Sequence, residues 1–389
     1  MNPVSIYPVI SALTLAIIIS FLFGKRRHVL KAASGRFVSI DGLRGYLAFF
    51  VFLHHSAIWY FFLRTEKWDV PPSHLYTHLG QSSVVLFFMI TGFLFSTKLI
   101  NGKNKPIDWM RLYVSRIMRL APLYFFMLSL VIIIAATLSN FVLNEPLIEL
   151  VKEILRWSTF TVLGTPDLNG ISKTAHIIAD VTWSLPYEWL FYFSLPLLAI
   201  FIRIIPPYPY LFFSLIFIAA MFWGRNLNLY HLVSFSGGIT AAFFVRRENF
   251  THFLNGKIGA FLILLAIAAI INFDTAYCLP ALFLLTIVFI IIASGNTFFG
   301  ILSHSVSLFL GEMAYSIYLL HGIVLFVTFK FIIGFQYAAS LTAIEHWLVI
   351  MGCTVFLIPL CFTTFYFIET PGMQATSKVN EWLHTFKSK

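Results

Sequence analysis

Long apolar runs separated by short polar segments extend through the whole sequence. A helix needs about 20 predominantly apolar residues to cross the hydrocarbon core of a bilayer, and about eleven runs approach or reach that length. The pattern therefore predicts an all-α, polytopic bundle of transmembrane helices. The expected spans lie near residues 6–23, 44–63, 83–100, 120–143, 184–204, 208–223, 229–245, 258–273, 276–293, 307–328 and 347–368.

Composition favours the same class of protein. Hydrophobic residues make up 59% of the 389 residues and charged residues only 11%, whereas soluble domains carry about 25% charged residues. The three cysteines show no metal-ligand spacing, so no bound metal is predicted. The first apolar run lacks a basic start and a small-residue cleavage site, which indicates a retained helix rather than a signal peptide.

The loops differ in charge, and this difference predicts the orientation. If the N-terminus lies outside, most of the 26 lysines and arginines fall on the cytoplasmic side, together with the C-terminus. The net charge of +10 is then explained by topology and contact with anionic membrane lipids. The sequence contains no long basic arm and no soluble domain that could bind nucleic acid, so nucleic-acid binding is not expected. Residues 143–181 form the longest outside segment and are expected to be a partly ordered cap.

Arg44 and His55 are ionisable residues in one expected helix. They are eleven residues apart, so both fall on one helix face, about 16 Å apart along the axis. Arg44, beside Asp41, then lies at the cytoplasmic edge and His55 about halfway across, while His54 points away as a packing residue. Arg44 alone could be a positive-inside anchor, and His55 alone an interhelical hydrogen-bond partner. Together on one face they indicate a functional site.

Arg116 and Arg119 are neighbours on one helix face at the entry to another span. Paired guanidinium groups suit phosphates, because each planar fork can donate two hydrogen bonds. The alternative is again positive-inside anchoring.

Two further groups of polar and aromatic residues lie at the ends of later spans. Trp183, Tyr187 and Glu188 open the fifth span. Glu188 could orient the His55 imidazole, bind a sugar hydroxyl or pair with a buried cation, since a lone carboxylate at that depth is costly. Tyr315 and His321 belong to the tenth span, where a structural role is as plausible as a catalytic one.

The last span is expected to end at Pro371, with Glu369 near the basic cytoplasmic residues.

These residues fit a reaction whose donor is cytoplasmic, phosphorylated and long, such as acetyl-coenzyme A. Its phosphates would bind Arg44, Arg116 and Arg119, and its pantetheine arm would extend towards His55. The imidazole would take a proton from an acceptor hydroxyl that attacks the thioester. The sequence shows no nucleophilic Cys or Ser elbow, so direct transfer requires fewer assumptions than an acyl-enzyme.

The motifs resemble those of the membrane acyltransferase family 3, bacterial O-acyltransferases of surface polysaccharides, lipopolysaccharide O-antigens, nodulation factors and some antibiotics. The resemblance extends from about residue 39 to 371, and Thr91 departs from the family's usual Ser. It rests on Ile40-Asp41-Gly42-Leu43-Arg44-Gly45 with His55, on the run Val84 to Leu94, on Arg116 with Arg119, on Trp183-Ser184-Leu185 with Glu188, on Tyr315-Ser316-Ile317-Tyr318-Leu319 with His321, and on Glu369 with Pro371.

The resemblance implies an acetyl-coenzyme A donor and an essential histidine. His55 and Glu188 are the expected catalytic residues. Donor-binding residues would be Asp41, Arg44, Arg116 and Arg119, and acceptor-binding residues Trp183, Tyr187, Tyr315 and His321.

We therefore expect three parts, residues 1–38 as an additional helix and linker, 39–373 as the acyltransferase domain and 374–389 as a cytoplasmic tail. The expected protein is a multi-pass O-acetyltransferase of the bacterial inner membrane. Its partners would be membrane lipids and a glycan or lipid-linked glycan acceptor, with homo-oligomers possible. The alternatives are a different acyl donor such as succinyl-coenzyme A, a glycolipid transporter or flippase, and a structural partner in an envelope assembly.

Overall fold

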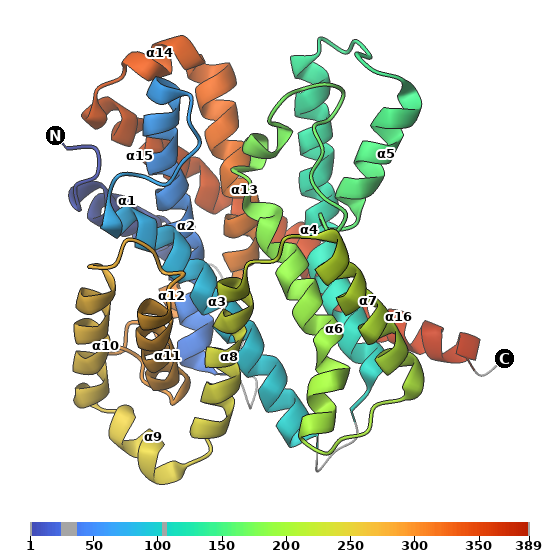
Figure 1. Ribbon diagram of the computed structural model, residues 1–389. Helices are drawn as coiled ribbons and strands as arrows, with labels where there is room; N and C mark the ends of the chain where they lie inside the picture. The colour runs from blue at the N-terminus through green and yellow to red at the C-terminus, as the bar shows by residue number, and fades with distance from the viewer. Residues whose placement is uncertain (1, 25–36, 103–106, 388–389) are drawn as a thin grey trace. The chain divides into compact units, whose positions relative to one another are not determined.

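The computed structural model describes residues 2–24, 37–102 and 107–387, and these residues are almost entirely helical (Figure 1). The described residues contain no β-strand, and one isolated bridge joins Leu168 and Ile171. The chain forms two compact units, the first made of Met1–Ser96 with Asn228–Cys361 and the second of Thr97–Leu227 with Phe362–Lys389.

The first unit is built around α2 (Val38–Thr65), with α12 (Ser305–Glu312) and α13 (Ala314–Val327) packed along it. Its α11 (Leu279–Ala293) packs against α8 (Leu229–Phe244) and α10 (Lys257–Ile270). The other elements are α1 (Tyr7–Gly24), most of α3 (His74–Asn101), α9 (Glu248–Leu254), the π-helix η3 (Thr328–Ile333), α14 (Phe335–Ser340) and most of α15 (Ala343–Thr364).

The second unit is built on α4 (Trp109–Leu138), which packs against α16 (Thr370–Lys387). Asp108 caps α4 by accepting a hydrogen bond from the backbone N–H of Arg111 at 2.9 Å, and Asn380 of α16 donates to its other oxygen. Burial opposes ionisation of Asp108, but these hydrogen bonds outweigh it and hold its pKa below the usual value. The other elements are α5 (Leu147–Ser158), the 3₁₀ helices η1 (Thr174–Ile178) and η2 (Val181–Ser184), α6 (Leu185–Phe201), α7 (Tyr208–Gly224) and the π-helix η4 (Phe365–Glu369).

Residues 143–181, expected to be only partly ordered, form a defined structure in this unit. The side chain of Asn169 donates to Ser139 and to the Val142 carbonyl and accepts from the backbone N–H of Asn144. The Trp157 indole, fully buried, donates to the Pro166 carbonyl at 2.9 Å.

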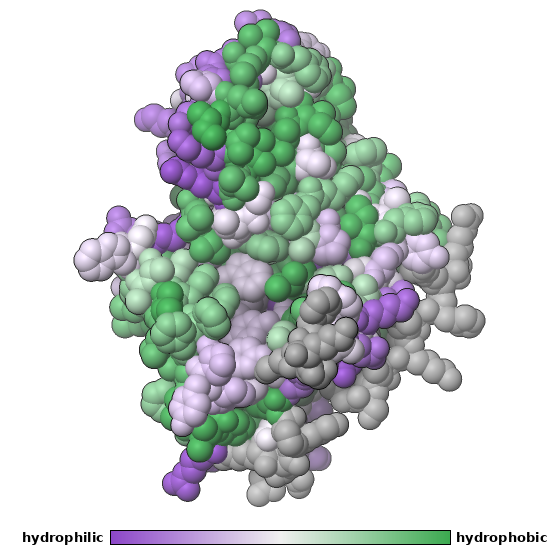
Figure 2. Space-filling view, turned by 90° about the vertical axis from the view of Figure 1, so that its right-hand side faces the viewer, coloured by the Kyte–Doolittle hydropathy of each residue, from purple (hydrophilic) through white to green (hydrophobic). Residues whose placement is uncertain are grey.

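Among the described residues, seven helical segments are long and apolar enough to cross a membrane. Four shorter apolar helices, α7, α8, α10 and α11, coincide with four of the other expected spans. Apolar side chains also form broad areas on the face shown in Figure 2. The all-helical membrane architecture is thus confirmed, whereas the count of eleven spans and the orientation remain predictions.

The structure departs from the sequence-based expectation at Met313 and at Pro371. The expected span 307–328 is divided at Met313 into α12 and α13. Pro371 does not end a helix, because the π-helical Phe365–Glu369 leads directly into α16, where Pro371 occupies the first turn. A proline lacks the N–H that an α-turn would need, and the wider π-turn before it accommodates that loss. The prediction that the helix ends at Pro371 is therefore wrong.

Glycines allow α2 to approach α12 at backbone contact distance. A Cβ atom on Gly311 would lie 1.8 Å from the Asp41 carbonyl oxygen, and one on Gly45 would lie 2.6 Å from Leu310. On the same side of α2, a Cβ on Gly42 would lie 1.9 Å from the Leu302 carbonyl oxygen. Such small residues are typical of tightly packed membrane helices. They fix α2 against the segment that leads into α13, which carries His321.

Candidate active site

The helix that carries Arg44 and His55 is continuous from Val38 to Thr65. The shared face and the separation of about 16 Å therefore hold for the folded chain. Asp41 lies inside the first turn of this helix and Arg44 in the second, rather than before or at its start. Helix α2 extends six residues beyond the apolar run at this end because polar residues can continue a helix that tertiary packing supports.

His55 forms a hydrogen bond with His321 of α13. The His55 Nδ1 atom lies 3.0 Å from His321 Nε2 and also 3.0 Å from the Val51 carbonyl oxygen. His321 Nδ1 lies 2.9 Å from the Ile317 carbonyl oxygen. Two residues that are 266 positions apart in the sequence are therefore brought together by the packing of α13 on α2.

The partners of these two rings determine where their protons sit. A carbonyl oxygen can only accept, so His321 Nδ1 carries the hydrogen that it donates to Ile317. The neutral His321 ring then has an unprotonated Nε2, which accepts the hydrogen on His55 Nδ1. In this arrangement the neutral His55 ring leaves Nε2 as a lone-pair acceptor, which is the form that a general base requires.

The surroundings of His55 hold its ring in place. The rings of Trp68 and His321 are both nearly parallel to it, with centroids 6.4 Å and 5.1 Å away. His321 is fully buried and its edge contacts Phe52 and Tyr318, whereas His55 is only half-buried. His55 is therefore the member of the pair that a substrate can reach. Sequence reasoning missed Trp68, because a loop residue just after the helix gives no periodic signal.

His54 has a different environment from its neighbour. It is 7% exposed, and its Nδ1 lies 2.8 Å from the Tyr76 carbonyl oxygen of α3. A Cβ atom on Gly80 would lie 2.4 Å from the ring, so the imidazole fills the space that this glycine leaves. These contacts agree with a packing role.

The second unit contains a polar chain from Arg116 to Glu188, in which Tyr192 is buried and the two ends are half-buried. Arg116 hydrogen-bonds to the Tyr192 hydroxyl, and Tyr192 in turn donates to Glu188 Oε2 at 3.1 Å. Arg116 also interacts electrostatically with Glu188. Of the three roles considered for Glu188, this geometry favours pairing with a buried cation. Tyr192, one turn after Glu188 on α6, was missed because a lone tyrosine in an apolar helix usually indicates packing.

Other cations surround this chain in the second unit. Arg119 interacts electrostatically with Arg116, and Lys98 does so with both Arg111 and Arg116. Arg116 and Arg119 both belong to α4, which begins at Trp109, so the helix starts well before its apolar run. Lys98, in the last turn of α3, adds a cation that has no motif in the sequence to mark it.

The remaining candidate residues lie at helix starts. The rings of Trp183 and Tyr187 meet edge to face at 6.0 Å at the start of α6. Arg225 interacts with Tyr187, and its guanidinium donates to the Thr161 carbonyl; burial lowers its pKa from the usual value. Tyr315 lies half-buried in the first turn of α13, one and a half turns before His321.

Comparison with known families shows the family of the chain. A family model described as an acyltransferase domain matches residues 37–366, which is most of the chain. The chain belongs to acyltransferase family 3. Comparisons with curated proteins and with solved structures found no significant match. The match includes both histidines of the pair and the candidate arginines Arg116 and Arg119, and it supports an acyltransferase activity in a chain with helices long and apolar enough to cross a membrane. Among the described residues, no group of three His, Cys, Asp or Glu side chains could hold a metal ion.

Proposed function

We propose that this family member is an O-acetyltransferase that moves an acetyl group from cytoplasmic acetyl-coenzyme A to a hydroxyl of a cell-surface glycan. The observation that carries the proposal is the hydrogen bond between His55 and His321, because it leaves Nε2 of the half-buried His55 ring as a lone-pair acceptor. The proposal includes an outside N-terminus, a cytoplasmic C-terminus and the bacterial inner membrane as its location.

In this mechanism the acceptor hydroxyl donates its proton to His55 Nε2 while its oxygen attacks the thioester carbonyl carbon. The tetrahedral intermediate then collapses, the carbon–sulfur bond breaks, and the coenzyme A sulfur takes the proton back from His55. His321 accepts the hydrogen bond from His55 Nδ1 throughout, which stabilises the imidazolium while it carries the charge. His321 is then a positioning residue, in place of the acceptor contact expected from the sequence.

The donor would bind through its phosphates to the cationic residues. Arg116 and Arg119 offer planar forks for bidentate hydrogen bonds, and Lys98 adds a point charge. Arg44, with Asp41 one turn earlier, would bind the part of the donor that lies nearer to His55 on the same helix. The Tyr192–Glu188 pair would hold Arg116 in position.

The acceptor would contact aromatic residues. Trp183 and Tyr187 offer an apolar face and a hydroxyl in one place, which suits the mixed surface of a sugar ring. Tyr315, in the first turn of the helix that carries His321, is the third proposed acceptor contact.

The Arg116→Ala variant should bind acetyl-coenzyme A about 10- to 100-fold more weakly, the range expected for loss of a hydrogen bond to a charged group. Isothermal titration calorimetry on the purified protein measures this affinity. Arg156→Ala on the exposed face of α5 is the matched control and should bind normally. Tyr192→Phe keeps the charge of Arg116 but removes the hydrogen bond between Tyr192 and Arg116, so it should weaken donor binding less. Unchanged affinity in Arg116→Ala would refute the donor role.

Mass spectrometry of the surface glycan, from cells with and without this protein, tests the proposed function as a whole. We expect loss of an acetyl mass increment on a sugar when the protein is absent. A mass increment of a succinyl or longer acyl group would show that the donor is a different acyl-coenzyme A. An unchanged acyl pattern combined with loss of the glycan from the surface would favour a transporter instead.

A further inference from the structure

An apolar cavity of about 380 Å³ lies inside the first unit. It is bordered by α1, α2, α3, α10, α11 and the segment before α12, and representative lining residues are Leu43, Leu47, Leu79, Ile263, Leu285 and Ile292. A dry, apolar cavity of about 150 Å³ is enough to hold benzene. In proportion, this cavity has room for on the order of fifteen carbon atoms.

The lining is matched to an uncharged ligand. The described residues that form it include no lysine, arginine, aspartate or glutamate. The Tyr46 hydroxyl is hydrogen-bonded to Ser307 at 2.8 Å, and His78 Nδ1 is hydrogen-bonded to Ser82 at 3.0 Å. These groups already have partners, so the cavity favours a hydrocarbon and gives little attraction to a polar molecule.

The cavity is elongated along the helices. On α3 its lining extends from Leu75 to Leu86, eleven residues or about 16 Å. This shape suits an extended chain better than a compact ring system.

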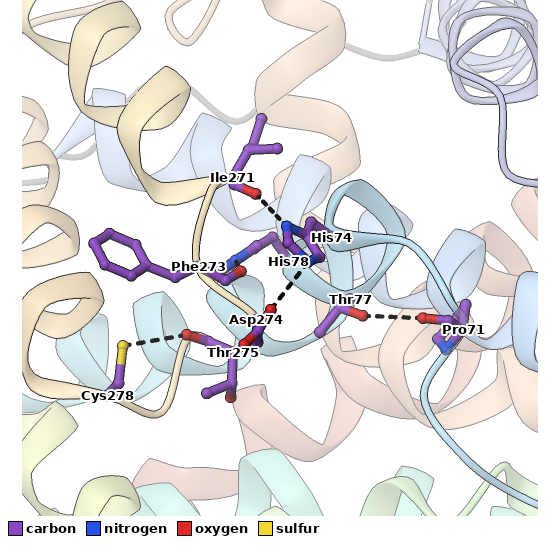
Figure 3. Close-up of polar contacts among 9 residues, drawn as sticks. All are labelled: Pro71, His74, Thr77, His78, Ile271, Phe273, Asp274, Thr275 and Cys278. Carbon is purple, nitrogen blue, oxygen red and sulfur yellow. Dashed lines mark hydrogen bonds and ion pairs between the residues drawn. The ribbon is translucent and has the colours of Figure 1, made fainter.

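Polar contacts between α3 and the turn after α10, called here the His74–His78 strap, lie at one end of the cavity lining (Figure 3). His74 contacts the Ile271 carbonyl oxygen and the Asp274 carboxylate, both at 3.1 Å. One turn further along α3, His78 Nε2 donates to the Phe273 carbonyl oxygen at 2.7 Å. Leu75, His78 and Ile271 also line the cavity, so this strap fixes its wall at that end.

The cavity adjoins exposed apolar side chains on the surface of the first unit. Two of its lining residues, Ile267 of α10 and Ile301, are 42% and 44% exposed. Beside Ile267, the outer face of α10 presents Leu264 and Leu265 at 44% and 68% exposure. In a membrane-spanning helix such a face contacts the hydrocarbon core, so the cavity opens beside the acyl chains of the bilayer.

We propose that this cavity is a binding site for one unbranched acyl chain of a membrane phospholipid. The chain would enter beside Ile267 and Ile301 and lie along α3 towards the His74–His78 strap. The site is separate from the candidate active site, because Tyr46, which lines the cavity, lies nine residues before His55 and therefore about 180° around α2 from it. A bound chain would pack α2 from the side away from His55. The proposal does not depend on the acetyl-transfer reaction.

Photo-crosslinking tests this proposal with a phosphatidylethanolamine that carries a diazirine in one acyl chain. The full-length protein is purified, loaded with the probe and irradiated, and labelled residues are identified by mass spectrometry. We expect labels on the cavity-facing residues of α2, α3 and α11. Leu285→Trp fills part of the cavity and should reduce these labels about tenfold. This is the loss of affinity expected if about two methylene groups of the bound acyl chain are no longer buried.

The matched control is Leu279→Trp, the same change at a residue of α11 that is 64% exposed. It should leave the cavity labels unchanged. If Leu285→Trp fails to fold, as judged by gel filtration, Val288→Phe on the same helix replaces it. Labels confined to outer faces such as Leu265, or cavity labels that persist in the filled variant, would overturn the proposal. Displacement of the probe by polyprenyl phosphate but not by unlabelled phospholipid would overturn the assigned occupant.

Discussion

The His55→Ala variant should lose acyl transfer by about 10²- to 10⁴-fold in kcat, the contribution typical of a positioned general base. The physical reason is that the His321 and Val51 contacts fix the His55 hydrogen on Nδ1 and leave Nε2 to take the proton of the acceptor. Alanine removes that base, and the half-buried site gives water little access to replace it. The rate of coenzyme A release in proteoliposomes, normalised to protein amount, measures the loss.

His54→Asn is the matched control for this variant. An asparagine amide can still donate to the Tyr76 carbonyl, and the space beside Gly80 stays occupied, so we expect activity within a few-fold of the parent. This pair of variants also decides which of the two adjacent histidines is the base. Full activity in His55→Ala with loss in His54→Asn would reverse the assignment.

The hydropathy pattern was sufficient to predict where most helices lie. The first expected span, residues 6–23, corresponds to α1 (Tyr7–Gly24), and the span at 208–223 corresponds to α7 (Tyr208–Gly224). Boundaries were predicted poorly where polar residues continue a helix. The expected span at 120–143 begins at Trp109 in the structure, because Asp108 caps the helix there and arginines interrupt the apolar pattern over residues 109–119.

The break at Met313 could not be predicted for a related reason. Residues 307–328 form one nearly continuous apolar stretch, yet α12 ends at Glu312, next to the Gly311 that contacts the Asp41 carbonyl. The break occurs beside a tertiary contact between residues 270 positions apart, which no local periodicity records. Helix propensity is regularly overridden in this way by packing.

The sequence predicted which helices carry the candidate residues, but it did not predict which residues form hydrogen-bonded pairs. Helical periodicity placed Arg44 and His55 on one face, and this required only that α2 be continuous. The His55–His321 bond and the Arg116–Tyr192–Glu188 chain join different helices, so their formation depends on how those helices pack. The cost of burying ionisable groups in a membrane predicts that such residues find partners, but it does not say which ones.

The His321→Leu and His321→Gln variants should separate a positioning role from simple packing. Leucine fills similar space but cannot accept the hydrogen on His55 Nδ1, which leaves only the Val51 carbonyl as a partner. We expect kcat to fall about 10- to 100-fold, which corresponds to loss of a hydrogen bond to the charged imidazolium. KM for acetyl-coenzyme A should stay unchanged, because His321 is fully buried and contacts His55 rather than the donor.

Glutamine offers a carbonyl oxygen that can accept the same hydrogen, so His321→Gln should recover much of the rate lost in His321→Leu. A residue that only fills space would give the opposite order, since leucine is the better match for the apolar contacts with Phe52 and Tyr318. Steady-state kinetics of both variants in proteoliposomes, with the amount of folded protein checked by gel filtration, measures the difference. Equal losses in the two variants would show that the hydrogen bond has no part in the mechanism. A raised KM for the acceptor with unchanged kcat would return His321 to the acceptor-binding role that the sequence alone predicted.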